Sequence, residues 1–505
     1  MAAKAPKTSR HTEVERKFDV VDSALSPSFE GLSAVARVER SPSQSLDAVY
    51  FDTPAHDLAA HRVTLRRRTG GSDAGWHLKL PAGPDARTEV HAPLGAADAR
   101  VPGELLDVVV AIVRDRPLAP VARITTTRNV HLIYDADGAA LAEFCDDHVT
   151  AWAAGTSDAG AAEQQWHEWE LELAESATAN TDLLDRLTNR LLDAGAVPAG
   201  HGSKLARVLD AAKLQGEDAG DEPHPVAVDP VHRAVAEQVD GLLVWDRAVR
   251  ADVYDSVHQM RVTTRKIRSL LQASEDSFGL SDDAWILDEL RQLASVLGLA
   301  RDAEVLAERY ERALDALPPE LARGQVRERL VDGAKRRYQS GLRRSLMAMR
   351  SQRYFRLLDA LDGLVAAEPP QAKPGEERAP VTIDAAYKRV RKAAKAAAHA
   401  AEEDRDEALH RIRKGAKRLR YTAAATGEVK VSEQAKTIQT LLGDHQDSVV
   451  SRTHLRQQAE AAHAAGEDTF TYGLLYQQED DLARTSREQL DAALSKLKKS
   501  VHHVH

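Results

Sequence analysis

The chain has 505 residues, of which 43% are hydrophobic and 29% are charged, and its formal net charge at pH 7 is −10. This length exceeds the roughly 250–300 residues that one hydrophobic core usually serves, so at least two domains are expected. The ordinary hydrophobic content and the mixed charges exclude a disordered or membrane-embedded class of protein. The acidic balance argues against nucleic-acid binding over the whole surface, which requires a basic footprint.

The first 18 residues contain basic side chains with no apolar stretch after them, so we expect neither a signal peptide nor a transit helix. Nothing in the chain resembles an apolar span of ~18 residues, and we expect a cytoplasmic protein. Cys145 is the only cysteine, which excludes an intramolecular disulfide and a thiolate cluster. Any bound metal is therefore expected to be held by oxygen atoms.

Residues 9–212 are rich in segments where polar and apolar side chains alternate, a pattern that predicts strands. Turn signals such as DADG and LPAGPD separate these segments, as in an antiparallel sheet built from hairpins. After Ser176 the pattern becomes helical, and the run LLDRLTNRLLDAG ends at a glycine. A stretch rich in acidic residues, Gly and Pro at 215–230 then predicts a linker.

Charged side chains share one face in several of these strands, because alternate residues of a strand point to opposite sides. The shared-face sets are Glu13, Glu15 and Lys17; Glu168, Glu170 and Glu172; Arg66 and Arg68; and His77 and Lys79. One such strand would usually just face water. Repetition over four strands, with acids on two and bases on the others, favours a closed barrel with a polar interior. Carboxylates would bind Mg²⁺ or Mn²⁺ there, while Arg and Lys neutralise phosphates.

The segment Glu13-Val14-Glu15-Arg16-Lys17 matches the ExExK signature of the CYTH domain, of the triphosphate tunnel metalloenzyme superfamily. Further motifs resemble that family in sequence order over residues 9–212: YFDT, LRRR, WHLKLP, Arg128, ALAEF, Glu170-Leu171-Glu172 and Ser203-Lys204. The resemblance implies an antiparallel eight-stranded β-tunnel with flanking helices, an α+β fold.

The resemblance also implies roles for single residues. Glu13, Glu15, Glu170 and Glu172 would surround one or two divalent ions and, with Lys17, form the catalytic set; Lys17, Arg66, Arg68, Lys79, Arg128 and Lys204 would bind the phosphates. Water would then attack a terminal phosphoryl group, with catalysis by positioning and charge neutralisation. Glu143 is an open candidate for metal binding or water orientation. Members of the family include inorganic, thiamine and RNA triphosphatases and adenylate cyclases, and the motifs do not separate these substrates.

Residues 231–495 show helical patterns almost throughout, and a Pro-rich break near 367–380 divides them into two similar parts. HQMRVTTRKIRSLL at 258 aligns with HRIRKGAKRLRYTA at 410, an offset of 152 residues, and LGLARDAEV at 297 aligns with LGDHQDSVV at 442, an offset of 145 residues. We interpret the likeness as an internal duplication that forms two all-α bundles.

Each repeat contains a basic stripe with helical spacing and no acidic residue inside it. The first stripe is His258, Arg261, Arg265 and Arg268, and the second is His410, Arg413, Lys417 and Arg420. Like charges at i,i+3 and i,i+4 destabilise a helix, so an external anion is expected to compensate. A solvated basic face is the simpler interpretation of one stripe, but repetition favours a site. Tyr421 is the only aromatic residue in either stripe, which fits a linear polyanion better than a nucleic acid.

The HxxR segments and the two LGxxxDxxV segments resemble the CHAD domain, a conserved-histidine α-helical domain associated with polyphosphate. The resemblance implies that His258, Arg261, Arg265, Arg268, His410, Arg413, Lys414, Lys417 and Arg420 bind polyphosphate, with Arg337, Arg389 and Arg391 as weaker candidates. Gly298 and Gly443 are expected to allow tight turns before Asp302 and Asp447, two acids with a structural role.

The leading hypothesis is a metal-dependent hydrolase of inorganic triphosphate whose helical domain binds polyphosphate, in the cytoplasm or at polyphosphate granules. Few aromatic residues are available to stack a base, which favours the inorganic substrate. Two alternatives stay open: a non-catalytic polyphosphate-binding protein of the granules, and an adenylate cyclase of the class IV type. Membrane and nucleic-acid partners are not expected.

Overall fold

A computed structural model of the chain describes residues 9–95, 100–153, 163–216, 230–273, 278, 285–367, 383–401, 404–425 and 427–502. Most of the predicted linker and of the predicted break, at 217–229 and 368–380, lies outside the described residues. The chain forms two compact units: the first contains residues 1–274, 282–290 and 346–367, and the second contains residues 275–281, 291–345 and 368–505. Each unit is described by itself.

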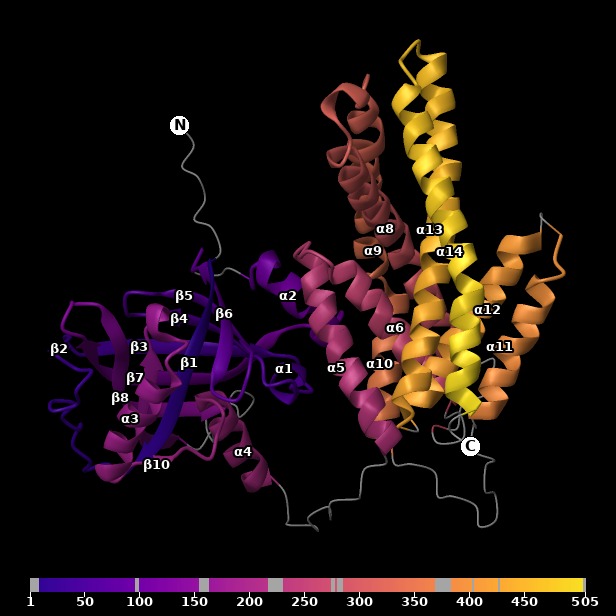
Figure 1. Cartoon of the computed structure of the whole chain (residues 1–505). Coiled ribbons are helices and arrows are strands. Elements are labelled where there is room, and N and C mark those ends of the chain that lie inside the picture. Colours follow the sequence, from indigo (N-terminus) through magenta and orange to yellow (C-terminus); the bar gives the residue numbers. More distant parts are fainter. Residues whose placement is uncertain are drawn as a thin grey trace, which may run out of the picture. The chain divides into compact units, whose positions relative to one another are not determined.

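The N-terminal part of the first unit is a closed antiparallel barrel (Figure 1). Its strands are β1 (Ser9–Val20), β3 (Gln44–Asp52), β4 (Thr64–Thr69), β5 (Gly75–Pro81), β6 (Ala86–Pro93), β7 (Ala119–Tyr134), β8 (Ala140–Ala153) and β9 (Gln164–Leu173). They pair in the order β1-β6-β5-β4-β3-β7-β8-β9, and β9 pairs back onto β1. This closure confirms the predicted eight-stranded tunnel.

Two short strands extend this sheet: β2 (Arg37–Arg40) pairs with β7, and β10 (Val197–Pro198) pairs with β1. The helices of this region are α1 (Asp57–Ala60), α2 (Gly103–Val113), α3 (Thr181–Asp193) and α4 (Lys204–Gly216). Sequence patterns predicted α3 but not the short helices α1 and α2.

One apolar core lies outside the barrel, on strand faces opposite to those that line the cavity. Phe18, Phe144 and Trp169 pack against Leu184 and Leu187 of α3. A second cluster joins Ile124 and Trp166, which share strand faces with the cavity residues Arg128 and Glu170, to Leu205 and Val208 of α4. The inward face is therefore polar along the cavity and apolar where α4 packs against it, while α3 covers an apolar outer face.

From residue 230 onward the described residues form helices and turns, with no strand among them, as expected for an all-α region. The helices are α5 (Pro230–Arg250), α6 (Ser256–Ala273), α8 (Trp285–Asp315), α9 (Gly333–Ala348), α10 (Gln352–Ala366), α11 (Ile383–Ala397), α12 (Arg405–Ala425), α13 (Val429–Ala464) and α14 (Phe470–His502). A π-helical turn, Glu328–Asp332, precedes α9. Among the described helices, none combines the length and hydropathy that a membrane span requires.

In the second unit, α12 packs against α11 and α13, and α13 packs against α14. Their shared core includes Val390, Ile412, Leu419, Ile438 and Leu497, all almost fully buried. On α12 the buried residues recur with helical spacing, so the remaining face carries the basic residues.

Candidate functional site

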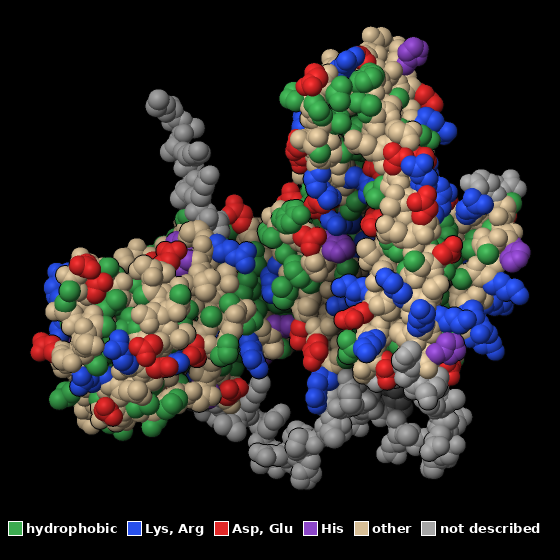
Figure 2. All heavy atoms as spheres, viewed as in Figure 1, with side chains coloured by type: hydrophobic (Ala, Val, Ile, Leu, Met, Phe, Trp, Pro, Cys, Tyr) green, Lys and Arg blue, Asp and Glu red, His purple; other side chains and the backbone are tan. Residues whose placement is uncertain are grey.

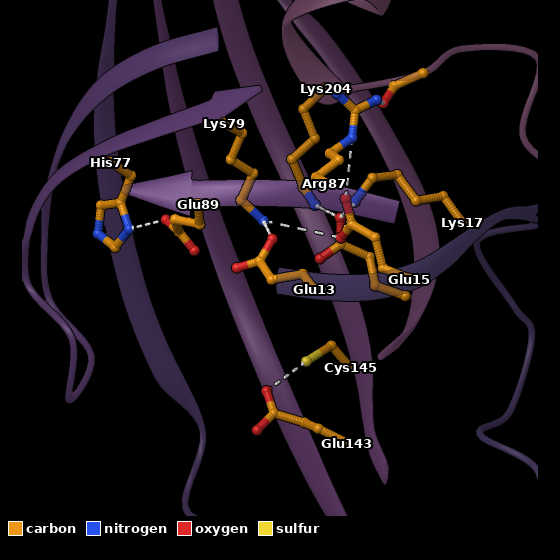
Figure 3. Close-up of polar contacts among 12 residues, drawn as sticks. Glu13, Glu15, Lys17, His77, Lys79, Arg87, Glu89, Glu143, Cys145 and Lys204 are labelled. Carbon is orange, nitrogen blue, oxygen red and sulfur yellow. Dashed lines mark hydrogen bonds and ion pairs between the residues drawn. The ribbon is translucent and has the colours of Figure 1, made fainter. Parts of the chain in front are cut away.

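The barrel encloses a cavity of about 530 Å³ that opens to solvent and is lined by charged side chains. All the tunnel residues predicted from the sequence line it: Glu13, Glu15, Lys17, Arg66, Arg68, Lys79, Arg128, Glu143, Glu170, Glu172 and Lys204. Figure 3 shows several of these side chains pointing toward one another from different strands. The alternation of strand residues thus brings together groups up to 159 positions apart, Glu13 and Glu172, and the start of α4 adds Lys204.

Three carboxylates form a row across neighbouring strands of the cavity. In the strand registers, Glu15 of β1 lies opposite Glu172 of β9, and Glu172 lies opposite Glu143 of β8. Burial raises the pKa of Glu172 to about 7; Lys79 opposes this shift, and Glu15 and Glu143 add to it. Among the described residues, no hydrogen-bond donor or cation makes direct contact with the Glu172 carboxylate. This row therefore carries negative charge that is not fully paired.

Glu170 has a different environment, because three cations surround it. Its carboxylate contacts Lys17, Arg128 at 2.5 Å and Lys204 at 2.8 Å. Although burial opposes the shift, Lys17 and Lys204 hold the pKa of Glu170 well below its ordinary value. Glu170 is thus an ionised anchor for the cations in this structure, while Glu15, Glu172 and Glu143 form the acidic row beside it.

Lys204 joins the start of α4 to the wall of the barrel. Its ammonium group lies 2.6 Å from Glu168 and 2.9 Å from Asp147, in addition to its contact with Glu170. Asp147 also accepts two hydrogen bonds from Arg128, at 2.8 and 2.6 Å, and it is fully buried. The sequence patterns alone did not predict Asp147 as part of this network.

A second acidic cluster lies nearer the start of β1, where Glu13, Glu89 and His11 each place one ligand atom within 4.8 Å of the others. Burial and a hydrogen bond with Glu89 raise the pKa of Glu13 to about 9, so Glu13 is neutral at pH 7. Lys79 lies 2.5 Å from Glu13. Glu89 and His11 were not predicted, although the alternation in ARTEVHAP places Arg87, Glu89 and His91 on one face.

Arg66 and Arg68 supply positive charge from β4 on the cavity wall. The Nε atom of each guanidinium is buried and has no hydrogen-bond partner among the described residues. Arg66 donates a hydrogen bond to the Tyr50 hydroxyl at 3.3 Å, while Arg68 pairs with Asp73. Both arginines therefore keep donor capacity that an anion in the cavity would use.

The first basic stripe lies on α6 in the first unit. Arg265 is exposed, and His258, Arg261 and Arg268 are half-buried. They flank Met260 and Ile267, which are completely buried and fix the orientation of the helix. The Nε atom of Arg268 is buried without a hydrogen-bond partner among the described residues.

The second stripe lies on α12 in the second unit, where Figure 2 shows Lys and Arg side chains gathered on the surface over α11–α14. Lys414 is exposed, and His410, Arg413, Lys417 and Arg420 are half-buried. Lys417 and Arg420 lie over the ring of Tyr421, at 5.8 and 5.6 Å from its centroid. Of the weaker candidates, Arg389 and Arg391 are exposed on α11, and Arg337 lies on α9.

The expected turns at Gly298 and Gly443 are wrong, because both glycines lie inside long helices, α8 and α13. A Cβ atom at Gly443 would lie 3.3 Å from the Nη2 atom of Arg413. The small residue thus leaves space for a stripe arginine to cross α13. Burial raises the pKa of Asp447, one turn further on, while the charges of Arg309 and Arg413 oppose that shift. The influence of Arg413 shows that Asp447 lies near the second stripe.

Comparisons with known proteins agree with this two-part organisation. The CYTH domain model matches residues 11–190, and the CHAD domain model matches residues 233–456. Two proteins of Mycobacterium tuberculosis, "Uncharacterized protein MT2285" (strain CDC 1551 / Oshkosh) and "Uncharacterized protein Rv2226" (strain ATCC 25618 / H37Rv), are each 70% identical over 512 residues, covering 99% of both chains. Among solved structures, PptA from Streptomyces chartreusis aligns with 52% of this chain and 98% of its own length, at 18% identity and a TM-score of 0.43. The CHAD domain from the plant Ricinus communis aligns with 56% of this chain and 97% of its own length, at 21% identity and a TM-score of 0.40.

Proposed function

Because this chain belongs to the same family as the two mycobacterial proteins and contains a CYTH domain followed by a CHAD domain, we propose that it hydrolyses inorganic triphosphate in the barrel cavity and binds polyphosphate through its helical domain. CYTH domains have the triphosphate tunnel metalloenzyme fold and occur in metal-dependent triphosphatases and adenylate cyclases. The residues of the cavity are the basis for choosing between these activities.

The observation that carries the proposal is that several carboxylates and several cations line the same cavity, while Glu172 has no cation in direct contact among the described residues. Acids from β1, β8 and β9 form a row, while Arg66, Arg68, Lys79, Arg128 and Lys204 line the same cavity from β4, β5, β7 and α4. A pure anion receptor gains nothing from carboxylates beside phosphate unless a cation lies between them. The arrangement fits a metal-bound polyanion.

The acidic row also fits a divalent metal on its own chemistry. Carboxylate oxygens are the ligands that Mg²⁺ and Mn²⁺ prefer. Glu172 has no direct cationic partner among the described residues, and its pKa is raised by burial first and then by the neighbouring Glu15 and Glu143. Glu15, Glu172 and Glu143 are therefore the residues we propose to hold the ion, with Glu13 and Glu89 as a second group. A bound divalent ion would neutralise phosphate charge and polarise the phosphoryl group that is attacked.

The cations have the task of holding the triphosphate. Arg66 and Arg68 would donate hydrogen bonds to phosphate oxygens, since their Nε atoms are buried without partners among the described residues. Lys79 and Lys204 would exchange part of their carboxylate contacts for phosphate oxygens. The carboxylates that keep these lysines charged also orient their side chains, so the two ammonium groups are in position before the substrate enters.

Inorganic triphosphate is the substrate that the cavity favours over a nucleotide. Of the residues that line the described cavity, Tyr50 is the only Phe, Tyr or Trp, and its hydroxyl already accepts a hydrogen bond from Arg66. A nucleotide base would find little aromatic surface to stack on. We therefore place the adenylate cyclase alternative second.

The test is phosphate release from inorganic triphosphate with Mg²⁺ or Mn²⁺ by the full chain. Glu172→Gln keeps the shape of the side chain and removes its charge, so it should lower the rate by roughly 100-fold or more. Glu39→Gln is the matched control, because Glu39 is exposed on β2 and pairs with Arg37. It should leave the rate unchanged.

Three results would count against the proposal in different ways. Pyrophosphate and cyclic AMP formed from ATP would favour the cyclase. Tight binding of triphosphate without phosphate release would favour the non-catalytic receptor. Equal rates for Glu172→Gln and Glu39→Gln would remove the acidic row from the reaction.

The helical domain is proposed to bind polyphosphate through the two stripes, each of which places several cations on one helix face. Replacing Arg413, Lys417 and Arg420 together by Ala should weaken binding of polyphosphate of defined length by 10-fold or more, and the loss should shrink at high salt. The matched control removes three exposed cations from the same unit: Arg312, Arg327 and Lys335. Equal affinities of the two triple variants would exclude the α12 stripe as the binding site.

A further inference from the structure

A separate group of metal-ligating side chains lies on the outer face of the barrel. Asp146 and His148 are on β8, and His167 is on β9. His148 and His167 are direct partners in the strand register, and Asp146 lies on the same face two residues before His148. None of the three lines the cavity, because the inward positions of these strands belong to residues such as Glu143 and Glu170.

The hydrogen bonds of His167 fix the state of its ring. Its Nδ1 atom lies 3.0 Å from the backbone oxygen of Val21, and a carbonyl only accepts, so Nδ1 carries a hydrogen. Its Nε2 atom points instead at Asp146 Oδ1, 2.6 Å away. The other oxygen of Asp146 accepts a hydrogen bond from Ser26. Ser26 therefore orients Asp146 and the Val21 carbonyl orients His167, each through the atom that does not take part in the contact between the two side chains.

His148 completes a set of three donors. Its ring stacks on that of His167, with the centroids 4.2 Å apart and the planes 16° from parallel. One ligand atom from each of Asp146, His148 and His167 lies within 4.8 Å of the other two. His148 is exposed, so an ion reaches the group from solvent on that side.

We propose that Asp146, His148 and His167 bind a divalent transition-metal ion, Zn²⁺ in the first instance. Two imidazoles and one carboxylate suit Zn²⁺, Fe²⁺, Co²⁺ or Ni²⁺ rather than Mg²⁺. Metal-binding histidines usually donate their second ring N–H to a carbonyl or carboxylate, as His167 does to Val21. The ion takes the place of the proton between Nε2 and Asp146. Ligand atoms on one tetrahedral Zn²⁺ lie about 3.4 Å apart, so the 2.6 Å contact widens by less than 1 Å through side-chain rotation.

The single cysteine led us to expect that any metal would be held by oxygen atoms alone. This site would add two imidazole nitrogens as metal ligands. Its role would be structural, unlike that of the cavity. Val21 and Ser26, which orient His167 and Asp146, belong to the segment between β1 and β2. A metal ion on β8 and β9 thus fastens that segment to the barrel wall.

The experiment is a Zn²⁺ titration of the full chain by calorimetry in millimolar Mg²⁺, which competes for the carboxylates of the cavity. All proteins carry H502A, H503A and H505A, because short His-rich tracts are a common transition-metal-binding composition. Glu172→Gln should leave the outer site intact. His148→Ala should weaken Zn²⁺ binding at one site by at least 10-fold, and folding is retained because His148 is exposed.

A second measurement identifies the ligands directly. X-ray absorption at the zinc edge should show two imidazoles in the chain with His148 and one in the His148→Ala variant at the same Zn²⁺ occupancy. The proposal is overturned if the chain binds no Zn²⁺ in the presence of Mg²⁺, or if His148→Ala changes neither the number of sites nor the affinity.

Discussion

Glu15 and Glu172 are direct partners in the ladder between β1 and β9, so two inward-pointing carboxylates meet on the strand pair that closes the barrel. Glu172 in turn lies opposite Glu143. Like charges placed directly opposite one another destabilise a sheet, and here the pair is also largely buried. Lys17, 2.9 Å from Glu15, supplies a counter-charge to that carboxylate, whereas Glu172 has no such contact among the described residues. Metal binding at Glu172 therefore has a measurable connection to pH.

Metal binding should release protons near pH 7. Glu172, with a pKa of about 7, is half protonated there, and Glu13, with a pKa of about 9, is neutral. Both must lose their protons to act as ligands, so Mg²⁺ or Mn²⁺ affinity should rise between pH 6 and pH 8. Calorimetry in buffers of different ionisation enthalpy measures the release. A binding enthalpy that does not depend on the buffer would contradict the assignment of these carboxylates.

Stability without metal should depend on pH through Glu172. The pKa of this group is raised from 4.5 to about 7 by folding, so its favourable contribution is complete below about pH 4.5 and is lost as the pH rises through 7. Glu172→Gln should therefore match the unsubstituted chain at pH 4 and exceed it at pH 8, by roughly 3 kcal/mol at most. Unfolding in chelator, followed by tryptophan fluorescence, gives the difference. An equal difference at both pH values would show that Glu172 ionises normally.

Adjacent arginines on β4 provide a paired test of the cavity wall. Arg66 faces the cavity, whereas Arg67 does not line it and lies on the opposite face of the strand. Arg66→Ala should lower kcat/KM for triphosphate by roughly 10–100-fold, since it removes charge-assisted hydrogen bonds of about 1.5–3 kcal/mol. Arg67→Ala changes the net charge equally and should have an effect below about 3-fold. Equal losses in the two variants would point to net charge rather than to contact with the substrate.

Gly341 lies at a close approach between α8 and α9 in the second unit. A Cβ atom at Gly341 would lie 2.6 Å from the backbone nitrogen of Ala300. Gly341→Ala should destabilise the protein by about 1–3 kcal/mol, because one helix backbone would have to move. Gly363→Ala is the control, since a Cβ atom there meets nothing within 4 Å and Ala favours a helix by about 1 kcal/mol. Urea unfolding of both variants should give opposite signs.

The alternation of strand residues was enough to predict that Glu13, Glu15, Lys17, Glu170 and Glu172 enter the tunnel, because a strand offers only two faces. It could not separate the roles of Glu170 and Glu172, which share a face. That difference depends on Lys17, Arg128 and Lys204, which other elements bring to Glu170 but not to Glu172. Sequence spacing contains no information about which cation lies nearest in space.

Other misses have equally local causes. Asp146 and Asp147 are adjacent acids, so strand alternation shows that one of them faces inward but does not show which one. In the structure Asp147 contacts Arg128, whereas Asp146 contacts His167 on the other face. The glycine of an LG motif is compatible with a turn or with close helix packing. Gly443 proved to be the second case because Arg413 crosses it.

Closure of the barrel by β1 and β9 also sets the order of events during synthesis. The partners Lys17 and Glu170 are 153 positions apart, so the ladder that joins them cannot form until nearly the whole domain has left the ribosome. Such distant pairings are slow to form because the intervening loop must close first. The row of Glu15, Glu172 and Glu143 is complete only after this step. A nascent or truncated chain that lacks β9 can fold hairpins, but it cannot close the barrel around the charged cavity.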